Sequence, residues 1–512
     1  MKQRQQPPEP AAEHTTDRSL ADFRAATAQQ WRHALLTGEV SSVELTTAAL
    51  TAAATGSELG AFLSLDPEFA LARAEQLDAT LQTLRSRLGA DQALTQLSAS
   101  APLLGLPTAF KDLVPVAGLP LTLGTRAIPT QTPAADHPLA QRVHSAGALS
   151  IGKTQVPEFG LPCYSENQLG DPARNPLDPS RTAGGSSGGA AAAVAAGMLP
   201  LAPGNDGGGS VRIPAAACGL VGLKPGRGRI PDDQAGDSVG NLMTSGPIAS
   251  TAEDAALLFD VMAGHQFTTA DRRRRRRSPV PAHGPAQRAV QRTLQKGMGR
   301  NGMRPLSFAV TTESPFSPEL DIVLADDAVA ALEKGIAALS AQGHHVQGAA
   351  HGTGDGSLWP QSYHQNFKTL WTSPLGQLDF DDEQLQQLEP LTQHFVQLAR
   401  SRPDAETQAA VSALQEYSDS AEAIFGAIDV LMTPMLASAP PPVGWFSALG
   451  AEENYVEQCR FTPYSSVVNV LGLPAISVPI HADQAGLSWS VQLIGKHSSE
   501  AQLLALAAAM TD

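Results

Sequence analysis

The polar start of the chain gives way to a long region of helical periodicity. Residues 1–17 are polar and rich in proline, a composition typical of a disordered tail. Between residues 19 and 90, apolar side chains recur every three or four positions, and Ser19 precedes the first of these segments as a candidate N-cap. We therefore predict an α-helical lead-in over residues 19–90.

After residue 100 the pattern changes to short apolar runs that are bounded by glycine or proline. These runs are typical of buried strands, and they lie at residues 102–116, 147–156 and 472–480. They alternate with stretches of helical spacing, at residues 137–147, 252–264 and 321–343. Alternation of strands and helices predicts an α/β fold, in which helices cover both faces of a sheet.

One polar stretch interrupts this alternation. Residues 268–305 include six consecutive arginines, Arg272 to Arg277. A solvated insertion loop is the simpler interpretation of such a charge run, and an arm that binds anions or nucleic acid is the alternative. No aromatic residues are interleaved that would stack on bases, so we expect a basic insertion without a nucleic-acid partner.

Composition narrows the class of protein. The 512 residues carry a formal net charge of −15, which disfavours nucleic-acid binding by the chain as a whole. The three cysteines lie far apart, which favours a reducing, cytoplasmic setting over a disulfide-built secreted domain. We find no apolar signal segment and no run long enough to span a bilayer, and we expect no membrane partner. The histidines form no His-Glu-x-x-His motif, and we expect no metal or other cofactor.

Two clusters of glycine and serine could carry chemistry, Gly184–Gly189 and Gly204–Pro214. The first cluster lacks the lysine of a phosphate loop, because Ala190 takes that place. It matches the Gly-x-Ser-x-Gly of a nucleophile elbow, but the proline-rich segment before it is a poor strand. A flexible linker is a third interpretation, although the cluster opens directly into an apolar helix.

A fourth interpretation combines both clusters with a lysine. Ser210 follows Gly207, Gly208 and Gly209, and a run of glycine amides beside a serine can form an oxyanion hole. A serine nucleophile needs a base. Lys111 ends an apolar run, where desolvation would lower its pKa and make it basic.

Together these residues resemble the amidase signature family of amide hydrolases. The order and spacing of Lys111, Ser186 and Ser210 match the family pattern. The resemblance covers roughly residues 20–507 and is carried by GLPTAFKD, GGSSGG, GNDGGGSVRIPAAACG, GLVGLKPGRGRIP, DVLMTPMLASAPPP and FTPYSSVVNVLGLPAISVP. It implies a single amidase domain over residues 18–507, with a large mixed β-sheet sandwiched between α-helices.

The resemblance also implies a role for each residue of the site. Ser210 is expected to be the nucleophile that forms an acyl-enzyme, Ser186 a bridging serine in a cis peptide, and Lys111 the general base. The amides of Gly207, Gly208, Gly209 and Ser210 would hold the oxyanion. Supporting roles fall to Ser187, Asp206 and Arg212. The family commonly has threonine where Gly207 stands and also at Asn205, and the extra glycine would loosen the loop or widen the acyl pocket.

The predicted function is hydrolysis of the carbon–nitrogen bond of a small-molecule amide, anilide, oligoamide or carbamate. A homodimer is left open. The alternative is a glutamine-hydrolysing subunit of a tRNA-dependent amidotransferase. Those subunits usually carry Arg-Gln-Pro after the nucleophile, whereas this chain has Arg212-Ile213-Pro214.

Two groups of residues outside the clusters are expected to be structural. Cys163 and Cys218 are expected to be small buried hydrophobes. The aromatic residues of segment 358–371 are expected to belong to the core rather than to a substrate pocket, namely Trp359, Tyr363, Phe367 and Trp371 with the adjacent Leu358 and Leu370.

Overall fold

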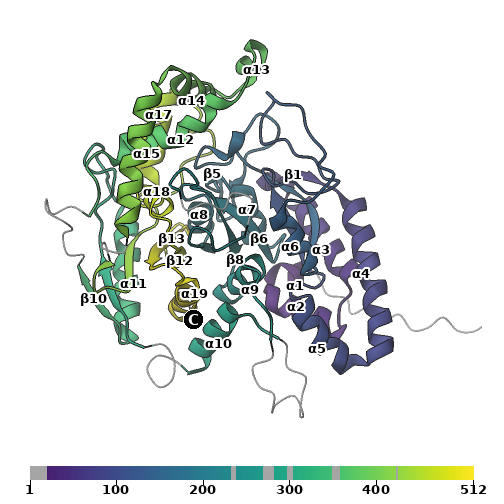
Figure 1. Cartoon of the computed structure of the whole chain (residues 1–512). Helices are drawn as coiled ribbons and strands as arrows, with labels where there is room; N and C mark the ends of the chain where they lie inside the picture. Colours follow the sequence, from purple (N-terminus) through teal and green to yellow (C-terminus); the bar gives the residue numbers. More distant parts are fainter. Residues whose placement is uncertain are drawn as a thin grey trace, which may run out of the picture.

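Eight strands form one mixed sheet through the middle of the protein (Figure 1). The computed structural model describes residues 20–231, 238–268, 282–296, 304–348, 358–421 and 425–511. The strands follow the spatial order β10 (His345–Gly348), β9 (Ser307–Val310), β11 (Val430–Pro434), β13 (Ser488–Gly495), β12 (Ala475–Ala482), β7 (Val221–Lys224), β8 (Thr244–Ala249) and β6 (Leu201–Asp206). The first three strands pair in parallel and the others pair antiparallel.

A smaller sheet extends this one beyond β6. Its order is β1 (Phe62–Leu65), β3 (Leu149–Thr154) and β2 (Pro107–Lys111). The Thr108 hydroxyl of β2 donates to the carbonyl of Leu201 in β6, at 3.2 Å, and joins the two sheets. The three predicted strands are confirmed as β2, β3 and β12.

Helices make up most of the N-terminal region, as predicted, with one exception. They are α1 (Leu20–Ala25), α2 (Ala28–Thr37), α3 (Ser42–Thr55), α4 (Pro67–Leu88) and α5 (Ala90–Ser100), with a short 3-10 turn at Ser57–Leu59. The exception is strand β1, which pairs antiparallel with β3 inside the expected helical stretch. Its four residues are all half-buried, so no alternation of exposed and buried positions marks the strand.

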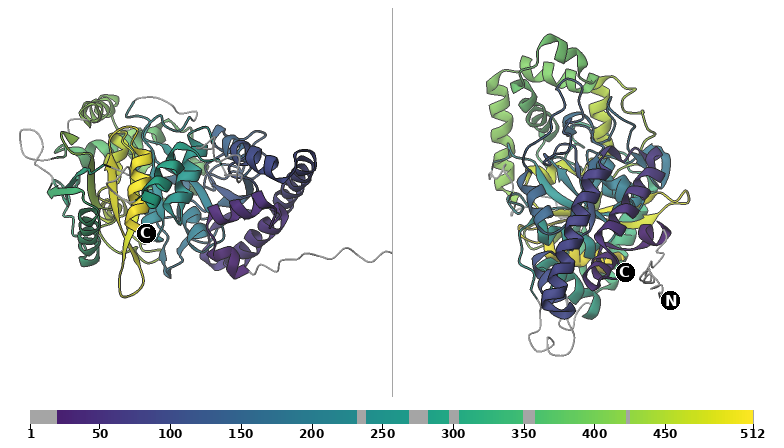
Figure 2. Two further views of the ribbon diagram at one scale, coloured as in Figure 1. Left: turned by 90° about the horizontal axis from the view of Figure 1, so that it is seen from below. Right: turned by 90° about the vertical axis from the view of Figure 1, so that its right-hand side faces the viewer.

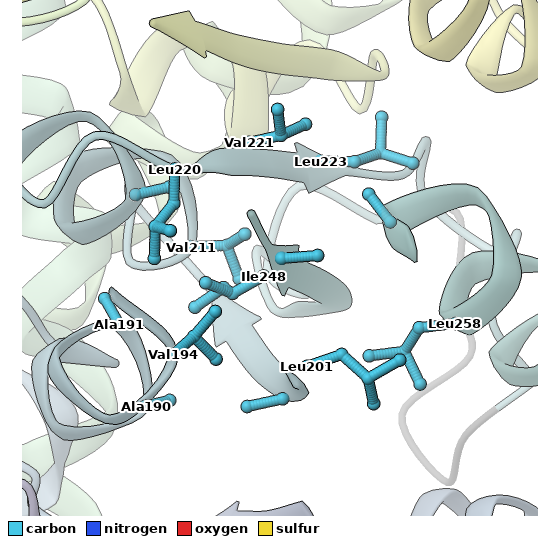
Figure 3. Close-up of a cluster of buried hydrophobic side chains, with 14 of the residues drawn as sticks. Ala190, Ala191, Val194, Leu201, Val211, Leu220, Val221, Leu223, Ile248 and Leu258 are labelled. Atoms are coloured by element: carbon cyan, nitrogen blue, oxygen red, sulfur yellow. The ribbon is translucent and has the colours of Figure 1, made fainter. Parts of the chain in front are cut away.

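Helices cover both faces of the main sheet. Figure 3 shows α7 (Gly188–Ala195) and α9 (Ala252–Met262) on opposite sides of the sheet, with Val194 of α7 near Ile248 and Leu258 of α9 near Leu201. Helix α19 (Glu500–Thr511) lies beside α9, and α11 (Asp326–Ala341) packs on β12 and β13. Short helices α6 (Pro138–Ser145) and α8 (Arg212–Ala217) complete the arrangement. The predicted α/β fold with a mixed sheet between helices is confirmed.

The polar stretch 268–305 is not a loop throughout. Helix α10 (Pro285–Lys296) packs on α9 and α19 through Ala286 and Val290, which are fully buried. Arg288 and Arg292 lie on the opposite side of the helix, and their charges make its apolar face hard to recognise in the sequence. The Arg272–Arg277 run lies outside the described residues.

Aspartates on neighbouring elements cap three helices, and two of them, Asp254 and Asp260, are fully buried. The Asp254 carboxylate accepts hydrogen bonds from the first amides of α2, at 2.9 Å each. Asp78 does the same for α3 and Asp260 for α10. A carboxylate satisfies the free N–H groups of a helix start and its partial positive charge, so these contacts fix how the helices meet.

A second helical layer stands at the end of the molecule opposite the N-terminal helices (Figures 1 and 2). It comprises α12 (Tyr363–Thr372), α13 (Asp382–Gln387), α14 (Pro390–Ser401), α15 (Asp404–Asp419), α17 (Ala451–Phe461) and α18 (Ser466–Val470). Its apolar residues form a second hydrophobic cluster, which also includes Ala309, Leu431, Ala475 and Ile494 of the main sheet. No helix in the described part of the chain is both long and apolar enough to cross a membrane.

The packing across β8 yields a stability prediction. Ile248→Ala removes a fully buried side chain between α7 and α9 and leaves a cavity. The free energy of unfolding, measured by urea denaturation, should fall by about 2–5 kcal/mol. Val323→Ala, at a side chain that is 71% exposed, is the control and should change it by less than about 0.5 kcal/mol. Equal losses in both variants would contradict the packing described here.

Candidate active site

The structure brings Lys111 and Ser186 into direct contact. Lys111 is the last residue of β2, and Ser186 lies in the turn before α7. The Lys111 Nζ and the Ser186 Oγ are 2.7 Å apart, and both side chains are about 1% exposed. The Asn205 carbonyl is 3.4 Å from the same Nζ. Two residues from distant parts of the sequence therefore form a buried amine–hydroxyl pair.

Burial makes Lys111 a base near neutral pH. Desolvation lowers the pKa of its amine from 10.5 to about 7, and the negative charge of Asp206 opposes only part of this effect. None of the ion pairs within 4 Å among the described residues involves Lys111. A substantial fraction of the amine is therefore neutral at pH 7 and can accept a proton from the Ser186 hydroxyl.

Tight backbone packing places Ser186. The peptide bond between Gly185 and Ser186 is cis, as the resemblance implied. A Cβ on Gly185 would lie 2.7 Å from the backbone of Tyr164, so only glycine fits there. The Ser165 hydroxyl donates to the Ser186 carbonyl at 3.2 Å and accepts from the Gly188 amide at 3.0 Å. Ser165 thereby ties the turn to the start of α7.

Ser187 links the two glycine–serine clusters. Its amide donates to the carbonyl of Ser210, at 3.2 Å. Its hydroxyl lies 3.3 Å from the Asn205 carbonyl and 3.4 Å from the Asn205 amide. The two turns are therefore held side by side, which supports the structural role predicted for Ser187.

Ser210 follows the end of β6 and faces a cavity. Its side chain is 7% exposed, more than Ser186 or Ser187. Among the described residues, no hydrogen bond joins the Ser210 hydroxyl to Ser186 Oγ. Catalytic contacts are often longer in the unliganded protein and tighten when substrate binds. The pair Lys111–Ser186 is therefore in place, and Ser210, whose carbonyl accepts a hydrogen bond from the Ser187 amide, lines the cavity.

The glycine loop offers fewer free amides than the sequence predicted. The Gly209 amide donates to the Asp206 carboxylate at 2.7 Å. A Cβ on Gly209 would lie 2.6 Å from both Ser465 and Ile213, and its φ of +128° also favours glycine. The amides of Gly207, Gly208 and Ser210 have no acceptor within the described part of the chain. These three N–H groups can donate to an oxygen of a bound substrate.

A buried ion pair lies behind the loop. The Arg212 guanidinium binds both oxygens of Asp206 at 2.9 Å, and both side chains are fully buried. Burial raises the pKa of Asp206, but the charge and hydrogen bonds of Arg212, together with Lys224 and Asn469, outweigh burial and bring the pKa to about 2. Arg212 also donates to Asn469 and Gln492, at 2.6 Å each. The Asp206 carboxylate thus stays charged, and its pair with Arg212 connects the loop to β13 and α18.

The cavity in front of Ser210 is mostly apolar. Aromatic side chains dominate its wall, with smaller polar groups and two thiols; the lining residues are Leu161, Pro162, Cys163, Gly208, Ser210, Ile213, Phe316, Phe367, Trp371, Phe395, Tyr455, Gln458, Cys459, Thr462, Ser465 and Ser466. None of these described residues is charged. The cavity therefore suits a neutral group next to the reacting carbon.

Three of the aromatic residues, Trp359, Tyr363 and Phe367, are buried in the helical core as predicted, and Trp371 packs against it. Phe367 and Trp371 also line the cavity. The reason is that the start of α12, at Tyr363, packs in the core, whereas the end of the same helix face, at Trp371, borders the cavity. Cys163 and Cys218 are buried, as predicted, although Cys163 also touches the cavity.

Several residues of the site had no recognisable signal of their own. Asn469, Gln492 and Ser465 hold the loop, and they come from α18, β13 and the turn before α18. Ser465 and Asn469 lie inside one of the segments that carried the family resemblance, which was the only available pointer. Gln492 lies in an apolar strand and is recognisable only through its contact with Arg212.

Comparisons with known proteins agree with this geometry. The sequence matches the Amidase family over residues 44–504. AmiB2 of Mycobacterium tuberculosis is 36% identical over 455 residues, which cover 86% of this chain and 90% of that protein. An acylamidase of Rhodococcus erythropolis is 32% identical and covers 80% of this chain and 81% of its own length.

A solved structure extends the agreement to the fold. The 6-aminohexanoate cyclic dimer hydrolase complexed with substrate superposes with a TM-score of 0.77 at 27% identity, over 96% of this chain and 97% of that one. The match spans nearly the whole length of both proteins, and the chain therefore belongs to the amidase family of hydrolases that cleave carbon–nitrogen bonds of non-peptide amides.

Proposed function

We propose that this protein hydrolyses a small neutral carboxamide through an acyl-enzyme on Ser210. The observation that carries the proposal is the buried 2.7 Å contact between Lys111 Nζ and Ser186 Oγ, beside a serine at the mouth of an apolar cavity. A hydroxyl becomes a useful nucleophile only when a base removes its proton. Here the base is a lysine whose pKa burial lowers to about 7, so that a substantial fraction of the amine is neutral at pH 7.

Acylation begins with attack of Ser210 Oγ on the substrate carbonyl carbon. When substrate is bound, the Ser210 hydroxyl passes its proton to Ser186 Oγ, and the Ser186 proton moves to Lys111, which becomes an ammonium. The amides of Gly207, Gly208 and Ser210 donate to the negative charge on the carbonyl oxygen. Preorganised donors of this kind need no reorientation during the reaction, which is why they lower the barrier.

Collapse of this intermediate breaks the carbon–nitrogen bond. The proton on Lys111 returns through Ser186 to the departing nitrogen, so that a neutral amine or ammonia leaves. Water then attacks the ester of Ser210 and loses its proton along the same path. Breakdown of the second intermediate releases the carboxylic acid and restores the Ser210 hydroxyl.

The cavity favours neutral amides over glutamine. An α-amino acid carries an ammonium and a carboxylate, and burying either without a partner costs several kcal/mol. The described lining residues offer neither charge as a partner. This supports a free-standing amidase, and the amidotransferase alternative receives no support from the site. Anilides, alkyl amides, oligoamides and carbamates remain within the chemistry of the acyl-enzyme.

A location and an assembly state are also proposed. Three unpaired, buried thiols fit a reducing compartment such as the cytoplasm. The proposed partner is the small-molecule amide alone, without nucleic acid or a membrane, and a homodimer stays open. Size-exclusion chromatography with light scattering measures the oligomeric state directly.

Ser210→Ala should abolish turnover. Removal of the nucleophile should lower kcat/KM for any hydrolysed amide by about 10³-fold or more. A fluorophosphonate probe followed by mass spectrometry should label Ser210 in the parent protein and leave the variant unlabelled. Ser86→Ala, on the exposed side of α4, is the control and should behave like the parent. Label on Ser186 or Ser187, or turnover by the Ser210 variant, would contradict the proposed nucleophile.

The pH dependence should follow Lys111. Its amine must be neutral to accept a proton, and its pKa is about 7. The value of kcat/KM should therefore fall about tenfold per pH unit below pH 7 and level off above it. Lys111→Arg keeps a charged group at every accessible pH and should be inactive throughout. Lys334→Arg, at an exposed lysine, should retain the parent profile. An active Lys111→Arg protein would show that another group is the base.

The role of Arg212 as an anchor can be tested by stability. Arg212→Met leaves the Asp206 carboxylate buried without its partner. Breaking such a pair from one side should cost about 3–5 kcal/mol in the free energy of unfolding. The control is Arg304→Met, which breaks the exposed pair with Asp429 and should cost at most about 1 kcal/mol. Urea denaturation of both variants makes the comparison, and equal losses would contradict the anchoring role.

A further inference from the structure

Three aromatic rings form a continuous stack along α12. Tyr363, Phe367 and Trp371 are spaced four residues apart and therefore lie on one face of the helix. The centroids of Tyr363 and Phe367 are 5.7 Å apart with an interplanar angle of 8°. Those of Phe367 and Trp371 are also 5.7 Å apart, at 24°. The planes of neighbouring rings are therefore nearly parallel.

The stack ends against the glycine loop. A Cβ on Gly207 would lie 3.2 Å from the Trp371 indole, closer than ordinary van der Waals contact. A Cβ on Gly208 would lie 3.7 Å from both Trp371 and Phe367. The absence of side chains at these two positions thus lets the indole approach the amides that would hold the carbonyl oxygen. An aromatic surface stands next to the position of the reacting carbonyl.

Other rings close the cavity around this surface. Phe316 meets Phe367 edge to face, at 6.4 Å and 69°. Phe395 and Tyr455 meet edge to face as well, at 5.7 Å and 82°. All three are buried, whereas Trp371 is only half-buried. The cavity is therefore a ring-lined, partly open pocket with Trp371 in its wall.

We propose that this pocket binds an aromatic acyl group, so that the preferred substrates are arylcarboxamides whose ring lies against Trp371 and Phe367. The inference rests on the proposed function, and it adds Trp371 as a residue that determines specificity. Flat rings stack on one another more favourably than a saturated ring of similar size does. The uncharged wall agrees with a neutral aryl group.

The order of the reaction steps favours the acyl group, rather than the leaving amine, as the part of the substrate that occupies the pocket. The amine must leave before water can attack the ester, so it needs an open path from Ser210. The acyl group stays attached through both steps and can rest against a wall of buried side chains. The rings next to Gly207 and Gly208 therefore fit the part of the substrate that remains.

Two matched pairs of amides test this assignment. Benzamide and cyclohexanecarboxamide share ammonia as the leaving group and differ in the acyl ring. Acetanilide and N-cyclohexylacetamide share the acetyl group and differ in the leaving amine. Each ratio of kcat/KM is divided by the ratio of the alkaline hydrolysis rates of the same two amides. The corrected ratio of the first pair reports recognition of the acyl ring. The corrected ratio of the second pair reports recognition of the leaving group.

The corrected ratio for the first pair should favour benzamide by about two- to tenfold in the parent protein. Trp371→Ala should reduce this preference to about one, and Trp371→Phe should keep most of it. Trp445→Ala, at a partly exposed tryptophan outside the cavity, is the matched control and should leave the preference unchanged. Fluorophosphonate labelling of Ser210 in each variant verifies that the site is folded.

The outcomes separate the two proposals. If Ser210 is still labelled, two results would overturn the aromatic acyl pocket. The first is a preference for benzamide that Trp371→Ala does not reduce. The second is a preference for acetanilide that depends on Trp371, without any preference for benzamide. Absence of a preference in a labelled, active parent protein would do the same. A parent protein that is not labelled at Ser210 and hydrolyses none of the four amides would overturn the proposed function, and the inference with it.

Discussion

The site depends on Lys111, a buried lysine that has no carboxylate within 4 Å among the described residues. Lys111 and Lys153 lie on neighbouring strands of the small sheet, and both are buried. Lys153 forms an ion pair with Asp112 at 3.0 Å, whereas the close contacts of Lys111 are the Ser186 hydroxyl and a backbone carbonyl. Taking a charged amine out of water without a partner costs several kcal/mol, so the neutral form is favoured. The same burial that makes Lys111 costly as a cation makes it useful as a base.

The charges that the site does contain are placed behind the reacting groups. Asp206 and Arg212 neutralise each other and satisfy their remaining hydrogen bonds with Asn469 and Gln492. This network connects the glycine loop to the centre of the main sheet. The loop is thereby held by rigid elements, while the cavity in front of it stays uncharged. The ion pair that anchors the glycine loop therefore lies on one side of it, and the apolar cavity lies on the other.

Much of the fold was predictable because its signals are local. The apolar runs that became β2, β3 and β12 are bounded by glycine or proline, and such runs can be read without knowledge of their partners. Strand β1 was missed because its partner β3 stabilises it, and its own residues show no alternation. Helix α10 was missed because its arginines hide the two positions that pack on α9.

The site was predictable only in part, for a related reason. Lys111, Ser186 and Ser210 stand in sequence contexts that point to chemistry, and the structure places the first two 2.7 Å apart. The walls of the cavity come from segments between residues 161 and 466 that meet only in the folded chain. A ring on one face of α12 looks the same in sequence whether it faces the core, as Tyr363 does, or the cavity, as Trp371 does.

The protonation state of Lys111 is the most direct test of this account. Selective isotope labelling of lysine followed by NMR titration reports each amine, and the spectrum of Lys111→Met assigns the signal. The assignment is needed because burial also lowers the pKa of Lys224 to about 7. The account predicts that the Lys111 amine titrates near pH 7. An amine that stays protonated beyond pH 9 would contradict it, because a charged lysine cannot take the proton that Ser186 passes on.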